Sequence, residues 1–181
     1  MISDAYQPVL GFVHKERLKV VADGLWMSKL RYGLALFGSL RLSESDPRCK
    51  MGTDLQIAQN KLLRLLTGTV LTDKKSISSM LYQLGIGSVN QMIAEARLLE
   101  TWKATHLQGA PLSNILVKKP IGPSSTTRSI SGGDLCTQGA PNSFSNLASG
   151  LWNRAGPEIR KATTLNSAKK EIRKFAKSLP T

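Results

Sequence analysis

The chain has 181 residues, of which 41% are hydrophobic and 20% charged, so its composition excludes a disordered tail and predicts a globular protein. Its 25 Lys and Arg residues exceed its 12 Asp and Glu residues, and the net charge of +13 predicts a polyanionic partner: nucleic acid first, and an anionic membrane surface second. Two distant cysteines and two histidines argue against a zinc site, and no apolar run is long enough to cross a membrane.

The first helical pattern covers residues 11–38, where apolar residues recur at helical spacing and basic residues fill positions between them. Asp23-Gly24 interrupts the pattern, so the region forms either two helices or one helix with a weak point. Residues 39–52 are polar and contain Pro47, which predicts a loop.

A well-delimited helix is predicted over Thr53–Gly68. Thr53 and Gln56 have the spacing of a capping box, and Gly68 stands where a helix ends. Helical spacing separates an apolar stripe from a polar face. The stripe comprises Leu55, Ala58, Leu62, Leu65 and Leu66, and the polar face comprises Gln56, Gln59, Asn60, Lys61 and Arg64. This polar face is either solvated surface or a contact to a nucleic-acid backbone.

Two further helices complete a predicted bundle. Ser76–Leu84 is expected to be a short helix that the following glycine stops. Ser88 and Gln91 form a second capping box and open a longer helix that ends by Gly109. The apolar side of this longer helix is predicted to be Val89, Met92, Ile93, Ala96, Leu99 and Trp102. Because short turns join the helices, we expect them to pack as one compact unit.

The composition changes after this bundle. Proline, glycine, serine and threonine dominate the next segment, which predicts a partly disordered linker. Helical patterns then return, with Pro157 placed to open a helix and a closing helix over about residues 165–179. The predicted fold class is mainly α: a helical bundle over residues 1–108, a Pro/Gly/Ser-rich linker over 109–142, and a small basic helical tail over 143–181.

The closing helix carries a basic face opposite its apolar stripe. Its cations are Lys169, Lys170, Arg173, Lys174 and Lys177. They either contact phosphates or only keep the helix soluble. Trp26, Trp102 and Trp152 lie in or beside apolar stripes, which favours packing in the core over stacking on bases.

The sequence shows no enzyme site. Phosphodiester chemistry with two metal ions needs paired carboxylates, and the nearest approach to a pair is Glu44 and Asp46, in a polar loop. We therefore expect no catalytic residue, no metal and no cofactor. No secretory signal is evident at the start of the chain, so we expect an intracellular protein, with a nuclear location left open.

Four segments carry a family resemblance when taken in order along the chain. They are Val21–Gly38 (VADGLWMSKLRYGLALFG), Leu55–Gly68 (LQIAQNKLLRLLTG), Ser79–Met92 (SMLYQLGIGSVNQM) and Leu151–Pro180 (LWNRAGPEIRKATTLNSAKKEIRKFAKSLP). Together they resemble the thumb and C-terminal tail of a non-LTR (LINE-type, jockey-like) retrotransposon reverse transcriptase. One departure is that Pro157 follows Trp152 by five residues, where the family usually has four.

The resemblance implies a fragment of an RNA-directed DNA polymerase that begins at an internal methionine. It lacks the family's [YF]-x-D-D palm motif, its fingers and its endonuclease, so no independent polymerase activity is expected. The family's thumb grips the template–primer duplex, which implies that Lys29, Arg31, Lys61 and Arg64 contact its backbone.

The partners that the resemblance implies are RNA or an RNA–DNA hybrid, together with the missing palm and fingers domains. No membrane partner is expected. The rival hypothesis is a structural or protein-interaction module in which the basic charge is incidental.

Overall fold

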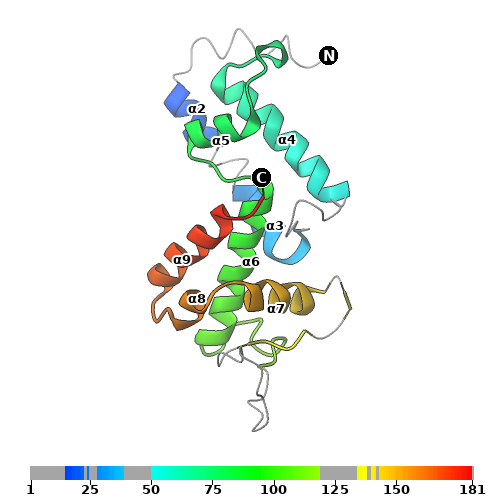
Figure 1. Ribbon diagram of the computed structural model, residues 1–181, viewed down its shortest axis with the longest axis vertical. Coiled ribbons are helices and arrows are strands. Elements are labelled where there is room, and N and C mark those ends of the chain that lie inside the picture. The colour runs from blue at the N-terminus through cyan, green and yellow to red at the C-terminus, as the bar shows by residue number, and fades with distance from the viewer. Residues whose placement is uncertain are drawn as a thin grey trace.

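The computed structural model describes residues 15–22, 24, 28–38, 50–118, 134–137, 140–141 and 143–180 (Figure 1). Within these residues the chain is mainly helical, which confirms the predicted fold class. The α-helices are α2 (Lys15–Ala22), α3 (Ser28–Phe37), α4 (Lys50–Thr67), α5 (Ile77–Leu84), α6 (Val89–His106), α7 (Phe144–Arg154), α8 (Pro157–Lys161) and α9 (Leu165–Lys177). A 3-10 turn, η2 (Leu71–Asp73), lies between α4 and α5. Trp26, Glu44 and Asp46 lie outside the described residues.

Helix α6 runs through the middle of the molecule, with α9 beside it and α7 across its lower part (Figure 1). It packs against α3, α4, α7 and α9. Its buried residues are Val89, Met92, Ile93, Ala94, Arg97, Leu98, Thr101, Trp102 and Ala104. Ala96 and Leu99, which the sequence predicts on the apolar side, are only half-buried. Several neighbouring helices cover α6, so its buried surface is wider than the single stripe that the sequence predicts.

The C-terminal helices α7, α8 and α9 share one hydrophobic core with α6. Large members of this core are Leu98, Trp102, Leu151, Trp152, Ile159, Ile172 and Leu179. Leu116 and Leu135, which lie within the predicted linker, are buried in the same core. The predicted boundaries near residues 108 and 142 stay predictions, but apolar packing joins the described residues on the two sides of them.

Helix α4 differs from its prediction at one end and agrees at the other. The prediction that Thr53 caps its start is wrong, because the helix already begins at Lys50 and Thr53 lies inside it. The end is as predicted: Gly68 has a φ of 65°, and the backbone N–H of Thr69 donates to the carbonyl of Arg64 at 3.0 Å. A positive φ favours glycine, so Gly68 stops the helix without strain.

The buried face of α4 is also rotated relative to the predicted stripe. Leu63 is fully buried, whereas Leu65, predicted to be inside, is 45% exposed. Gln59, predicted on the polar face, is 1% exposed. Its Nε2 donates to the carbonyl of Gly87 at 2.7 Å, and its Oε1 accepts from the backbone N–H of Val89 at 3.1 Å. Gln59 is buried because it bonds the peptide groups where α6 begins, which no local pattern reveals.

Other predicted helix ends, in α5, α6 and α8, agree with their local signals. Ser76 and Ser88 each accept a hydrogen bond from a backbone N–H in the first turn of α5 and α6, and Gln91 completes the capping box of α6. Gly85, at a φ of 65°, ends α5. Pro157 occupies the first turn of α8, as predicted.

Arg97 is the large polar side chain at the centre of α6, and it is fully buried. Its Nε donates to the carbonyl of Ala35 at 3.2 Å, and its Nη2 donates to that of Gly38 at 2.5 Å. Burial lowers the pKa of the guanidinium to about 10, so Arg97 remains charged at neutral pH. The cation therefore lies at the negative end of α3, where its charge compensates free carbonyl groups.

Replacing Gln59 by Ala should lower the free energy of unfolding by about 1–3 kcal/mol, because the buried N–H of Val89 loses its acceptor. Urea unfolding followed by circular dichroism measures the change. Asn60→Ala on the same helix is the matched control, since among the described residues the amide of Asn60 bonds the side chain of Gln56 and not the start of α6. Equal losses of unfolding free energy in the two variants would contradict a specific stabilising role for the bonds from Gln59 to the start of α6.

Candidate nucleic-acid interface

Local sequence fixes which side of α9 faces the core. Thr164 caps the helix by accepting from the backbone N–H of Ser167 at 3.2 Å. Ala168, Ile172 and Ala176 then follow at intervals of four residues, and each is at most 3% exposed. This row packs toward α6, so the residues on the opposite side of α9 face away from the core.

The outward side of α9 collects the cations that the sequence predicts there. Asn166, Lys169, Lys170, Arg173, Lys174 and Lys177 line one shallow hollow of about 440 Å³. We call these six residues the basic face of α9. They form two adjacent rows at i, i+4 spacing, each about 12 Å long at 1.5 Å per residue. The sequence prediction did not include Asn166, although its spacing of four from Lys170 was a usable signal.

The cations of the basic face differ in their partners. Arg173 donates through Nε to Oε1 of Glu95 on α6 at 2.9 Å, in a solvent-accessible ion pair. Lys170, Lys174 and Lys177 are exposed, and no ion pair joins them to an acid among the described residues. Arg173 therefore ties the basic face to α6, while these three lysines are available to an external anion.

The thumb residues implied by the resemblance lie elsewhere. Lys61 is exposed on α4, and Arg64 is half-buried, with its Nη1 3.4 Å from the carbonyl of Val70. Lys29 and Arg31 belong to α3, but their side chains lie outside the described part of the structure. Helices α4 and α9 both contact α6 and occupy different levels of the molecule (Figure 1). The structure thus gathers the α9 cations together and places Lys61 and Arg64 on another helix.

The surroundings of Lys61 are more apolar than predicted. Ile57 and Leu65 lie one turn to either side of it and are 47% and 45% exposed. Because Gln59 turns inward, the outer side of α4 is not the continuous face of amides and cations that the sequence suggests. A surface with alternating aliphatic and cationic groups fits a protein contact at least as well as a phosphate contact.

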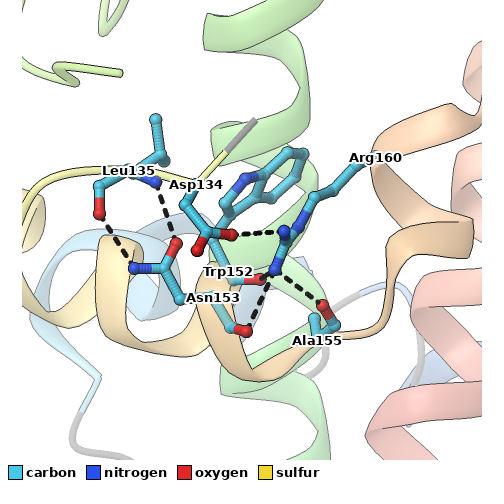
Figure 2. A network of polar contacts seen from close by, with 6 residues as sticks. All are labelled: Asp134, Leu135, Trp152, Asn153, Ala155 and Arg160. Atoms are coloured by element: carbon cyan, nitrogen blue, oxygen red, sulfur yellow. Dashed lines mark hydrogen bonds and ion pairs between the residues drawn. The ribbon is translucent and has the colours of Figure 1, made fainter. Parts of the chain in front are cut away.

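One basic residue of the C-terminal region has a structural role. Figure 2 shows Arg160 of α8 reaching Asp134, with which it forms an ion pair. Its Nη2 donates to the carbonyls of Trp152, Asn153 and Ala155 at 3.1, 3.0 and 3.3 Å, at the C-terminal end of α7. Arg160 therefore caps α7 and holds residue 134 against it, and it does not line the basic face of α9.

Asn153 attaches the same short segment to α7 (Figure 2). Its Oδ1 accepts from the backbone N–H of Leu135 at 2.9 Å, and its Nδ2 donates to the carbonyl of Leu135 at 2.8 Å. The amide satisfies both peptide groups of Leu135, whose side chain is fully buried in the core. Trp152 and Asn153, which belong to the fourth resembling segment, therefore have structural roles: the first is buried in the core and the second bonds Leu135.

The tryptophans behave as the apolar stripes predict. Trp102 and Trp152 are each 2% exposed, and Nε1 of Trp102 donates to the carbonyl of Ala162 at 3.2 Å. His106 stacks on Trp102 with ring centroids 4.7 Å apart. Rings buried this deeply cannot stack on bases, so for these two residues the core prediction is confirmed.

Comparison with protein-family models, with curated proteins and with solved structures finds no match. Among the described residues, no group of three or more His, Cys, Asp or Glu side chains could hold a metal ion. No described helix has the combined length and apolar character needed to cross a membrane.

Replacing Asp134 by Ala should lower the free energy of unfolding by about 2–3 kcal/mol, because Arg160 would lose its counter-charge in a largely buried site. Thermal or urea unfolding measures the loss. Glu100→Ala is the control: it breaks the Glu100–Lys103 pair, whose side chains are 36% and 34% exposed, and should cost less than about 1 kcal/mol. A loss for Asp134→Ala no larger than the control's would contradict a stabilising role for this ion pair.

Proposed function

We propose that the chain binds nucleic acid without sequence specificity, through the basic face of α9. The observation that carries this proposal is the alignment of Lys170, Lys174 and Lys177 on the outer side of one helix, exposed and without ion pairs to described acids. Cations held in rows on a rigid helix can replace the counterions condensed on a phosphate backbone, and releasing those counterions drives binding.

The source of the chain is a second part of the proposal. We propose a fragment of a non-LTR retrotransposon reverse transcriptase that consists of thumb and tail, on the strength of the four resembling segments. In such a fragment the expected ligand is RNA or an RNA–DNA template–primer, whose template strand extends beyond the paired primer. The sequence has no Asp-Asp pair for a palm, so the proposal includes binding and excludes polymerisation by this chain alone.

The geometry favours contact to the backbone over contact to base edges. Lysine is a flexible point charge that reaches a phosphate without a fixed geometry, whereas reading a guanine edge usually takes the planar fork of arginine. Arg173, the arginine of this face, pairs with Glu95. Binding through these lysines should therefore be sensitive to salt and largely indifferent to sequence.

A protein-interaction module is the second candidate, and one observation favours it. Ile57 and Leu65 expose aliphatic surface on either side of Lys61 on α4. Exposed aliphatic groups can pack against a protein partner, and within the proposed family origin the palm and fingers domains are the partners to expect. The two candidates use different helices, so they can be tested separately.

The first test replaces Lys170, Lys174 and Lys177 by Glu. Binding of a labelled RNA–DNA hybrid is measured by fluorescence anisotropy across a salt series. We expect affinity at low salt to fall at least tenfold and the slope of log K against log salt to shrink by roughly 2–3, because about three phosphate contacts are lost.

The control carries the same change in net charge at exposed cations on other elements: Lys74, Arg154 and Lys161 to Glu. An equal loss in the control would mean that net charge alone attracts the hybrid, and the proposed interface on α9 would be wrong. Weak binding of both RNA and DNA by the wild-type chain at low salt would favour the protein-interaction module.

A separate variant tests the implied thumb contacts. Lys61→Glu with Arg64→Glu should reduce affinity and salt slope for the hybrid if α4 grips the duplex backbone. The matched control is Lys74→Glu with Arg154→Glu, which changes net charge equally. Unchanged affinity would leave α9 as the nucleic-acid interface and α4 as a surface for protein contact.

A further inference from the structure

An apolar pocket of about 540 Å³ lies between α3, α6, α9 and the turn that follows α6. Its aliphatic lining includes Leu36, Met92, Ala96, Leu99, Leu112 and Ile172. The volume falls within the range of about 300–1,000 Å³ that is typical of small-ligand pockets. A ligand that enters it must therefore present a compact apolar surface of moderate size.

This pocket adjoins the basic face of α9. Lys169 and Arg173 line both the apolar pocket and the basic hollow, so the two spaces meet at these side chains. A single ligand that occupied both would need an apolar part on one side of Lys169 and negative charge on the other. A nucleotide has this composition, because the flat faces of its base pack on hydrophobic side chains while its phosphate is anionic.

Two carboxylates line the apolar pocket as well. Glu95 and Glu100 are each paired through one oxygen, with Arg173 and Lys103 respectively. An ionised carboxylate has about four lone-pair sites, so both can accept further hydrogen bonds. Carboxylates accept from the amino groups of bases and repel phosphates, so they favour a base inside the pocket and the backbone outside it.

We propose that this pocket binds one unstacked nucleobase of a strand whose phosphates lie on the basic face of α9. The inference rests on the proposed function and adds a preference: a strand with free bases binds better than one that offers phosphates alone. In a duplex, the base must first leave its stack, at a cost of a few kcal/mol. The chain should therefore prefer single-stranded RNA or DNA, or the unpaired end of a hybrid, to a fully paired duplex.

The test compares two single strands of equal length and charge, one with normal bases and one abasic throughout. Wild-type protein should bind the normal strand about tenfold more tightly, because a base packed in a protein site contributes binding that phosphates alone do not. Ala96→Leu, which narrows the pocket, should make the affinities for the normal and the abasic strand nearly equal. Ala58→Leu is the matched control, a half-buried helical alanine that does not line this pocket, and it should keep the preference.

A second measurement needs no variant. A 2-aminopurine base in the normal strand should become brighter on binding, since leaving its neighbours relieves quenching by stacking. The same probe should be protected from acrylamide in the complex, as expected for a base inside a pocket. No change in brightness or in protection would overturn the inference even if Ala96→Leu failed to fold.

The outcomes separate the two proposals. If the triple Glu variant of α9 weakens binding of both strands but the wild type binds them equally, the pocket inference fails and the proposed function stands. If Ala96→Leu folds and keeps the wild-type preference, the base lies elsewhere and the inference fails. If the triple Glu variant binds both strands as tightly as the wild type does, the proposed function fails, and the inference that rests on it fails with it.

Discussion

The burial of α6 on several sides is the constraint on which the rest of the structure depends. The sides of α6 that α3, α4, α7 and α9 cover have little contact with water, so the polar groups there need partners within the protein. Gln59 bonds the start of α6, and the carbonyls of Ala35 and Gly38 accept from Arg97 near its middle. These bonds fix how α3 and α4 sit on the central helix.

The same packing distinguishes two kinds of cation among the described residues. Arg97 and Arg160 lie inside, where they compensate the carbonyl ends of α3 and α7. The lysines of α9 remain outside, because Ala168, Ile172 and Ala176 occupy the side of that helix that faces α6. The basic residues that give the chain its high net charge therefore include structural cations and cations that can bind a ligand. Only the second kind belongs to the proposed interface.

Periodicity and end signals predicted much of the fold. The glycine after α5, the capping box of α6 and the first-turn proline of α8 act through hydrogen bonds or backbone angles within a few residues, so a local reading suffices. The α9 face was predictable for a similar reason: its apolar and basic residues segregate cleanly around one helix. The rotation of α4 was not predictable, because Gln59 is buried by a partner about thirty residues away.

By itself, therefore, the sequence determined the helical class, several helix ends and the basic face of α9, since each depends on neighbours along the chain. Tertiary structure decided which arginines are buried, which side of α4 faces inward, and where an apolar pocket meets the basic face. Those features arise where helices distant in sequence meet. Burial there makes unpaired polar groups costly, so buried side chains such as Gln59 form hydrogen bonds to groups on other helices. Helical periodicity does not specify those partners.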